Sequence, residues 1–258
     1  MKRLLTTLSH KWPEYLLEIM VLIVGIYGAF MLENWNEKRI ERNQEQLILQ
    51  QLRNEYQKNL EQLEDKIQLR NISINKAIKI LEMAGSPAQV TFDTLINAMK
   101  FLGIMPTFDP ISSDIISSGN IRLIQNQQLK ESLQAWSSDV IQLQEEEQKN
   151  IELQHLHLSP IHGKYGLGWH LLHSLYDNSI ESQSLINIVL IDTLKTTEIR
   201  IPKPIKVPDA FTILNDDEFT SIVSHLISLN HIANQQSLVL KAKILEILIH
   251  IDADLDKN

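Results

Sequence analysis

The sequence predicts an all-α fold in which an N-terminal transmembrane helix continues into a long helix that packs in a helical bundle. Residues 16–32 form an apolar run in which Glu18 is the only charged side chain. Neither Gly nor Pro occurs between Lys38 and Ala84, so nothing in that stretch interrupts a helix. The 258-residue chain has only 8 Gly and 8 Pro, which favours long helices over a loop-rich β protein.

The apolar run predicts a transmembrane helix over residues 13–35. Such a helix is about 34 Å long, which matches a hydrocarbon core of about 30 Å. Trp12 and Tyr15 flank one end and Trp35 the other, at the interface positions that aromatic rings prefer. A cleaved signal peptide is the main alternative, but the run is long for one and no small-x-small cleavage site comes after it. A buried helix of a soluble protein is the other alternative.

Three residues of this helix are candidates for contact with another transmembrane helix. Glu18 lies about one turn inside the predicted span, where an ionisable group either contacts a partner or snorkels to the headgroups. Gly25 and Ala29 form a small-xxx-small pair, which lets two helices approach closely. Small residues are also common in spans that have no partner, so both interpretations stay open.

The long helix after the span carries one apolar stripe. Its members recur at spacings of three and four, typical of an amphipathic helix: Leu49, Leu52, Tyr56, Leu60, Leu63, Ile67, Ile74, Ile78 and Leu81. This spacing allows a coiled coil, but we expect intramolecular packing because the later helices need the same partner. The Gly85-Ser86-Pro87 sequence predicts the end of the helix.

The remaining elements are also predicted to be helical. We expect helices over 93–103, from Thr107 or Asp109 to 118, and over 126–157, 169–176, 184–194 and 215–253. Serine, proline and glycines predict a loop over 159–168, and three prolines predict an extended segment over 197–208. The chain therefore divides into a short N-terminal flank (1–12), the transmembrane helix (13–35) and a soluble helical bundle domain (36–258).

Composition excludes several classes of function. The formal charge of -8 disfavours nucleic acid as a partner, because phosphate binding needs a basic face. The absence of cysteine rules out disulfides and thiolate chemistry, and no nucleophile elbow, phosphate loop or dinucleotide fingerprint occurs. The Ser117-Ser118-Gly119 sequence predicts a helix end with a left-handed glycine, and Glu145, Glu146 and Glu147 are interpreted as a solvated helix face.

Five histidines between residues 155 and 173, together with Glu152, are the candidates for a metal site. Glu152 and His155 have the Glu-x-x-His spacing that di-iron bundles use twice, but it occurs here once. His170 and His173 are also three residues apart, a spacing that permits shared ligation of a metal. Gly and Pro separate these groups, so we expect surface or packing histidines and no cofactor.

Two stretches together resemble a family of uncharacterised single-span bacterial membrane proteins common in Bacteroidetes. The first, residues 18–37, has an acidic residue, an apolar run with Gly and Ala, and then Asn-Trp-Asn-Glu. The second, residues 107–129, contains Ser-Ser-Gly with spaced Ile and Leu after it. Tyr27 and Glu33 depart from the commonest pattern. The resemblance covers about the first 140 residues and implies one N-terminal span and a helical domain, with no known activity.

The leading hypothesis is an interaction or scaffold protein of the bacterial inner membrane, and not an enzyme. Its expected partners are the lipid bilayer and either a second copy or another membrane or envelope protein. The N-terminal flank has basic residues and no acidic residue before Glu14, whereas Lys38, Arg39 and Arg42 on the other side of the span are interspersed with glutamates. The basic counts are close, and the short flank without acidic residues favours a cytoplasmic N-terminus and a periplasmic C-terminal domain. A sensory or ligand-binding domain that signals through a membrane partner is the alternative, and a metal-dependent enzyme is the third hypothesis.

Overall fold

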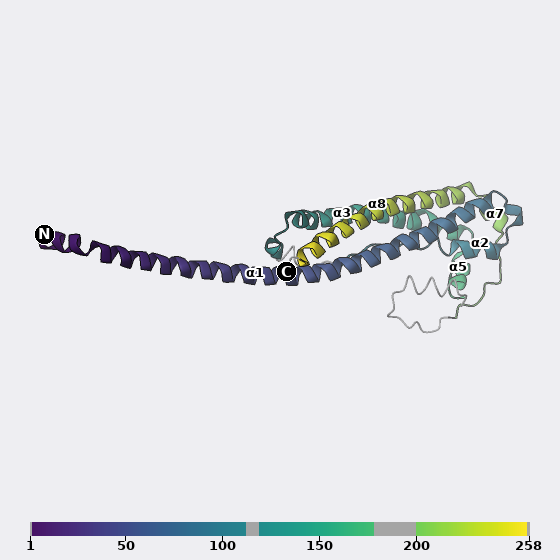
Figure 1. Cartoon of the computed structure of the whole chain (residues 1–258). Helices are drawn as coiled ribbons and strands as arrows, with labels where there is room; N and C mark the ends of the chain where they lie inside the picture. Colours follow the sequence, from purple (N-terminus) through teal and green to yellow (C-terminus); the bar gives the residue numbers. More distant parts are fainter. Residues whose placement is uncertain (1, 112–118, 178–199, 257–258) are drawn as a thin grey trace.

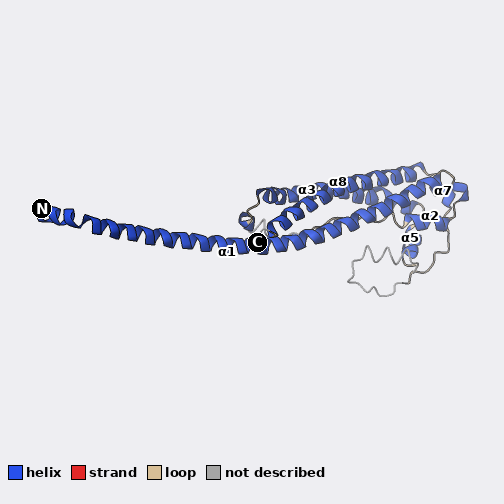
Figure 2. Cartoon of the chain, in the orientation of Figure 1, coloured by secondary structure: helices blue, strands red, loops and turns tan. Residues whose placement is uncertain are grey.

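Helices dominate the structure, a computed structural model that describes residues 2–111, 119–177 and 200–256. These residues contain α-helices, two 3-10 turns and one π turn, and no strand (Figure 2). The predicted all-α class is therefore confirmed.

Helix α1 (Lys2–Ala84) is a single uninterrupted element of 83 residues, about 125 Å long at a rise of 1.5 Å per residue. Its N-terminal half projects alone, and its C-terminal half lies against the other helices (Figure 1). We refer to residues 42–256 as the body. The helix ends where the sequence predicts, with the Gly85 amide donating to the Leu81 carbonyl at 3.2 Å.

Two further long helices pack against the second half of α1. Helix α3 (Gln127–Leu153) begins after Asn126, whose side chain accepts a hydrogen bond from the Leu129 amide at 3.2 Å. Helix α8 (Asp217–Leu255) begins after Asp216, whose carboxylate accepts from the Glu218 amide at 3.0 Å. Side-chain oxygens at these positions satisfy amides that the first turn leaves unpaired. Both observed starts lie within two residues of the predicted ones.

Short helices close the end of the body that lies farthest from the N-terminus (Figure 1). Helix α2 (Phe92–Met99) starts at a Thr91 cap. It ends earlier than the helix predicted over 93–103, because residues 100–103 form turns. Helix α5 (Gly168–Leu175) lies where a short amphipathic helix is predicted. Helix α7 (Ala210–Leu214) is not among the predicted helices; the Asp209 carboxylate caps it by accepting from the amides of Phe211 and Thr212.

The predicted loop over 159–168 is wrong in its first half. Helix α3 passes through a π turn, η3 (Gln154–Leu158), into helix α4 (Ser159–Lys164). The π turn resets the hydrogen-bond pattern so that Pro160 falls in the first turn of α4, where a missing amide N–H leaves no bond unmade. Only the next residues leave the helix, with Gly166 at a φ of 65°.

Two other predicted helices fall partly or wholly on residues outside the described ranges. Residues 104–111 form no helix, and the remainder of the helix predicted to end at Ser118 lies outside the described residues. The helix predicted over 184–194 also lies outside them. Gly119 adopts the left-handed conformation expected of it, with a φ of 76°, and residues 200–209 form no helix, in line with the prolines there.

Two large apolar cores lie along the body, and Leu69, Phe101 and Ile104 form a third, smaller cluster. The first contains residues 49–63 of α1, 129–143 of α3 and 233–251 of α8. The second contains residues 77–83 of α1, most of α2 and residues 219–229 of α8. From Leu49 to Ile67 the predicted stripe of α1 packs against helices of its own chain. Beyond Arg70 the buried face shifts to Ala77 and Ile80, and the predicted stripe residue Ile78 is 41% exposed.

Candidate functional site

The first candidate region is the apolar segment of α1, which we define as residues 16–32. By length and composition this part of α1 could cross a membrane, and a signal sequence would have the same properties. Its large apolar side chains are exposed, for example Val24 at 71%. A continuous exposed apolar surface of this size is unfavourable in water. The segment therefore needs an apolar environment that the described part of the chain does not supply.

The three predicted contact residues lie within this segment. Glu18, Gly25 and Ala29 are all exposed, and their spacing of seven and four residues places them on one face of α1. A Cβ atom added at Gly25 would meet no other atom within 4 Å. No described residue packs on this face, so contact with another transmembrane helix stays a prediction.

The body begins about two turns after Trp35. Arg42 forms an ion pair with Glu45 at 2.5 Å and donates to the Asp254 carbonyl at 3.1 Å. Gln46 donates to the same carbonyl at 3.3 Å. The last turn of α8 is thereby fixed to the point where α1 enters the body, so the apolar segment and the body share one continuous and supported helix.

Polar side chains of α1 hold the chain that returns from α2 to α3. Buried Glu45 accepts a hydrogen bond from the Gln125 amide at 2.6 Å. Buried Asn59 donates to the Ile111 carbonyl at 2.9 Å and accepts from the Ile111 amide at 2.8 Å. Arg70, the third, donates to the Pro106 carbonyl at 3.4 Å. The spacings of 14 and 11 residues place all three on one face of α1.

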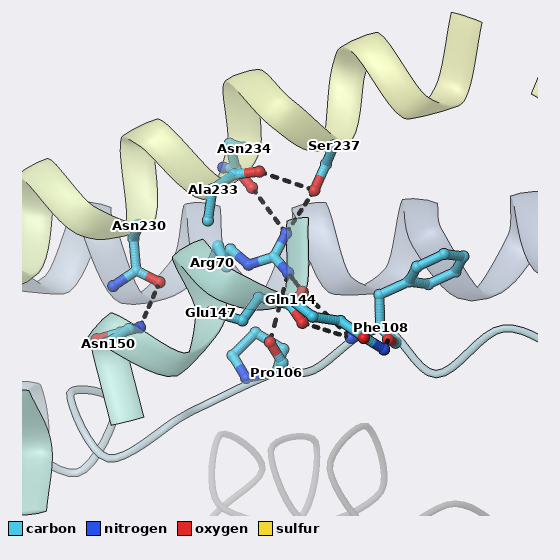
Figure 3. Close-up of polar contacts among 10 residues, drawn as sticks. All are labelled: Arg70, Pro106, Phe108, Gln144, Glu147, Asn150, Asn230, Ala233, Asn234 and Ser237. Atoms are coloured by element: carbon cyan, nitrogen blue, oxygen red, sulfur yellow. Dashed lines mark hydrogen bonds and ion pairs between the residues drawn. The ribbon is translucent and has the colours of Figure 1, made fainter. Parts of the chain in front are cut away.

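Arg70 is the centre of a buried polar layer (Figure 3). Its side chain is 1% exposed, and it donates to Ser237 Oγ at 2.8 Å and to Asn234 Oδ1 at 3.4 Å. It also forms an ion pair with Glu147, whose carboxylate oxygens accept from the Phe108 amide at 2.9 and 3.1 Å. One guanidinium thus connects α1, α3, α8 and the segment between α2 and α3.

The layer extends one turn further through an amide pair. Asn150 of α3 donates to Asn230 Oδ1 of α8 at 3.1 Å, and both side chains are buried. We define the polar layer by six residues: Arg70, Glu147, Asn150, Asn230, Asn234 and Ser237. In each of the three long helices these residues fall between or beside the positions that build the two apolar cores.

Burial opposes the charge on both members of the ion pair. It raises the pKa of Glu147 above its ordinary value, although Arg70 and the Phe108 amide favour the carboxylate. It lowers the pKa of Arg70, although Glu147 favours the guanidinium. Each charge therefore depends on the other, since a buried charge without its partner is strongly destabilising.

The interpretation of Glu147 as part of a solvated face is wrong, because its side chain is buried against Arg70. The signal is present in the spacing of α3. Its inward positions recur by threes and fours through Leu133, Trp136, Val140 and Leu143. The next step of four in this series falls on Glu147, so the same periodicity places this carboxylate inward.

Arg70 has a similar signal in the sequence. In α1 the stripe passes from Ile67 to Ile74, a gap of seven residues. Arg70 fills this gap at a spacing of three from Ile67 and four from Ile74. Two charged residues of opposite sign at inward positions of two predicted helices indicate a buried pair.

The first two metal candidates lie on the surface. Glu152 is exposed near the end of α3 and accepts a hydrogen bond from Gln148 at 3.4 Å. His155 is exposed in the π turn after α3. Within the described residues no group of three or more His, Asp or Glu side chains could hold a metal ion.

The other two candidates hold the proline-rich segment. His170 Nε2 lies 2.9 Å from the Lys206 carbonyl and His173 Nδ1 lies 2.9 Å from the Ile201 carbonyl. A carbonyl oxygen only accepts, so each of these ring nitrogens carries its proton. Trp169 Nε1 donates to the carbonyl of Pro202 at 2.8 Å. Helix α5 thus binds the backbone of residues 201–206 through three rings.

Comparison of the chain with protein-family models, with curated proteins and with solved structures finds no match in any of the three. The resemblance noted in the sequence therefore stays a prediction. Among the described residues, the exposed apolar segment points outward from the body, and the polar layer holds its helices together.

Proposed function

We propose that the chain is a single-pass protein of a bacterial inner membrane whose helical bundle acts as an interaction or scaffold module at the membrane surface. The observation that carries this proposal is the continuity of α1. One helix contains both the exposed apolar segment and the stripe that packs into the body. A lipid-embedded first half would therefore hold the body at a fixed distance from the membrane.

The residues after the apolar segment support its retention as an anchor, rather than its removal as a signal sequence. Residues 33–41 are helical and offer no small-x-small site, which is the pattern that cleavage needs. The Arg39 guanidinium lies 5.6 Å from the centre of the Trp35 ring. Trp and Arg are residues that favour a membrane interface, so this pair marks the expected exit point.

An interaction role is supported by how the body uses its polar groups. Glu45, Asn59, Arg70 and Glu147 all bind partners within the chain. In the part of the chain that the structure describes, these buried polar groups hold segments together. They leave the outer faces of the long helices as the surfaces available to a partner.

The distribution of basic residues supports an orientation. Lys2, Arg3, Lys11 and the α-amino group precede the apolar segment without an acidic residue among them, whereas the three basic residues at 38, 39 and 42 alternate with glutamates. Basic residues near a span favour the cytoplasmic side. The N-terminus then lies in the cytoplasm and the body in the periplasm.

The test is fractionation of the full-length chain with a C-terminal tag, expressed in a bacterium. We expect the protein to remain in the membrane pellet after alkaline carbonate, at the full mass of the chain. The tag should become sensitive to protease when the outer membrane is opened. Release by carbonate, or a mature product shortened by the apolar segment, would contradict the proposal.

A matched pair of variants sharpens this test. Val24→Arg places a charge in the middle of the apolar segment, which costs about 2.5–3.5 kcal/mol of insertion free energy, so we expect a smaller membrane-bound fraction. Ile141→Arg makes a comparable change at an exposed position of α3 and should leave fractionation unchanged.

Stoichiometric iron, zinc or manganese in the purified protein would instead favour the metal-dependent enzyme.

A further inference from the structure

Helix α8 carries a second apolar surface that no described part of the chain covers. Leu238, Ala242, Leu245 and Ile249 recur at spacings of four, three and four on its outer face. Leu238 is 48% exposed, Leu245 41% and Ile249 66%. We refer to these four residues as the α8 stripe. The opposite side of α8 faces the core with buried residues: Leu240, Ile244 and Ile247.

Ion pairs border the stripe on both sides. Towards α1, Lys241 pairs with Glu64 at 2.7 Å. Towards α3, Glu246 and Val239 lie beside the stripe, and Lys243 beyond them pairs with Asp139. The stripe therefore runs along the outer face of α8 between its two neighbouring helices, as an apolar ridge with charged margins. Such a pattern is typical of a helix that pairs with another helix.

The heptad positions of the charges favour one orientation of pairing. With Ala242 and Ile249 at a and Leu238 and Leu245 at d, Lys241 occupies a g position and Glu246 an e position. In a parallel pair a g residue faces the e residue five positions later on the other helix. The Lys241 of each copy, which pairs with Glu64 of its own chain, would then lie between that carboxylate and the Glu246 of the other copy. An antiparallel pair would place lysine opposite lysine and glutamate opposite glutamate, which repel.

The geometry of α1 favours the same orientation. The pairs Arg53–Asp252, Glu64–Lys241 and Arg70–Ser237 show that α8 runs antiparallel to α1. Two copies inserted through α1 in the same direction would be related by a two-fold axis perpendicular to the membrane. Such an axis makes the two α8 helices parallel.

We propose that the α8 stripe binds the α8 stripe of a second copy of this chain, as a parallel two-fold pair. This inference rests on the proposed membrane anchoring. The stripe offers three large apolar side chains per copy. The area that they can bury is smaller than the roughly 800 Å² per partner of a stable interface. Tethering of both copies in one membrane raises their effective concentration. The pair therefore forms in the membrane and dissociates when the protein is diluted in detergent.

The test exploits the absence of cysteine from the chain. Leu245→Cys and Ile249→Cys are each introduced into the full-length protein, and native membranes are treated with a mild thiol oxidant. In a parallel pair identical residues meet, so each variant should form a disulfide-linked dimer. Ser138→Cys, exposed on α3, is the matched control, and we expect about tenfold less dimer there because its thiols are not held together.

Charge exchange tests the orientation. Lys241→Glu and Glu246→Lys are each added to a Leu245→Cys chain carrying its own tag. Each variant alone would place like charges at both g–e′ contacts, whereas a mixed pair would place opposite charges at both. Random pairing of equal amounts gives two mixed dimers for each self-paired dimer of either kind. We expect co-expression to raise this ratio about threefold or more, given the modest energy of exposed ion pairs.

The outcomes separate this inference from the proposed function. Equal cross-linking at residues 245, 249 and 138 in a carbonate-resistant protein would overturn the α8 pairing and leave the anchoring intact. Failure of the protein to reach the membrane fraction would overturn both. Preferred cross-linking of a Leu238→Cys copy to an Ile249→Cys copy would indicate antiparallel packing and also overturn the inference.

Discussion

The two halves of α1 are parts of one helix but have opposite surroundings. Residues 16–32 are apolar on every face and exposed. Residues 49–83 bury one face only, with Leu49 to Leu63 in the first core and Ala77, Ile80 and Met83 in the second. The arrangement of apolar residues around the helix, rather than their number, indicates the environment of each half. A stripe indicates other helices of the body, and an all-round surface is typical of lipid contact.

A charged residue within each half makes the comparison sharper. Glu18 is exposed in the apolar segment. Arg70 interrupts the stripe and is 1% exposed, with an ion pair and three hydrogen bonds to other segments. A charged residue within an apolar run thus marks one of two positions. At Arg70 the fold supplies the ion-pair partner, and at Glu18 no described residue does.

The largest expected effect comes from removing the charge that the fold has satisfied. Arg70→Met leaves Glu147 buried without its cation, and we expect a loss of about 3–5 kcal/mol in the free energy of unfolding. Denaturant unfolding of the full-length protein in detergent, monitored by circular dichroism, measures it. Arg53→Met, which removes the exposed pair with Asp252, is the control and should cost less than about 1 kcal/mol.

The double variant Arg70→Met, Glu147→Leu distinguishes loss of a partner from loss of packing. It removes both buried charges and leaves apolar side chains of similar volume, so most of the lost stability should return. A double variant as unstable as the single one would show that the hydrogen bonds to Ser237 and the Phe108 amide, rather than the unpaired carboxylate, dominate.

The next effect contrasts the two halves of α1 directly by the same substitution. Leu63 is fully buried in the core, and Leu63→Ala should cost about 2–5 kcal/mol because it leaves a cavity. Leu22 is exposed in the apolar segment, and Leu22→Ala should leave the unfolding of the body unchanged, as measured by the same denaturant titration. A stability loss at Leu22 equal to that at Leu63 would contradict the separation of the two halves.

Much of this architecture can be predicted from the sequence because it depends on local signals. Helix starts at Asn126 and Asp216 have side-chain acceptors that cap helices, and the end of α1 has the glycine and proline that stop one. Pro160 wrongly predicts a loop. A helix continues through it because a π turn in the preceding residues places the proline in a first turn, and no residue nearby signals that π turn.

The candidate site is harder to predict because it depends on contacts between distant residues. Arg70 and Glu147 are 77 positions apart in the chain. The spacing within each helix places both side chains inward, but it does not show that they meet. The predicted contact residues Glu18, Gly25 and Ala29 depend on a second helix, which one chain cannot supply. Periodicity therefore identifies inward positions, but only the fold shows which of them meet.

A smaller effect is expected where α1 holds the segment between α2 and α3. Asn59→Ala removes both hydrogen bonds to the Ile111 backbone and leaves an amide and a carbonyl without these partners, so we expect a loss of about 1–3 kcal/mol in the free energy of unfolding. Asn54→Ala, at an exposed position of the same helix, should change it by less than about 0.5 kcal/mol. Equal effects would mean that the returning segment is held by apolar contacts alone.

The smallest effect concerns a buried polar group that, unlike Arg70, lacks a hydrogen-bond partner. His162 Nε2 is buried without a hydrogen bond, and burial lowers the pKa of this histidine below its usual 6.5. Between the unfolded and the lower folded pKa the unfolded chain binds a proton that the folded chain does not, so stability falls as the pH falls below 6.5.

Replacement of the ring isolates this contribution. Between pH 7 and pH 5.5 we expect the Tm of His162→Gln to fall by roughly 1–2 °C less than the Tm of the parent. His155→Gln, at an exposed ring, should keep the parent's loss. If the Tm of both variants falls as much as that of the parent, the ring of His162 is solvated in the folded protein. Burial of this ring would then contribute nothing to the pH dependence of the body.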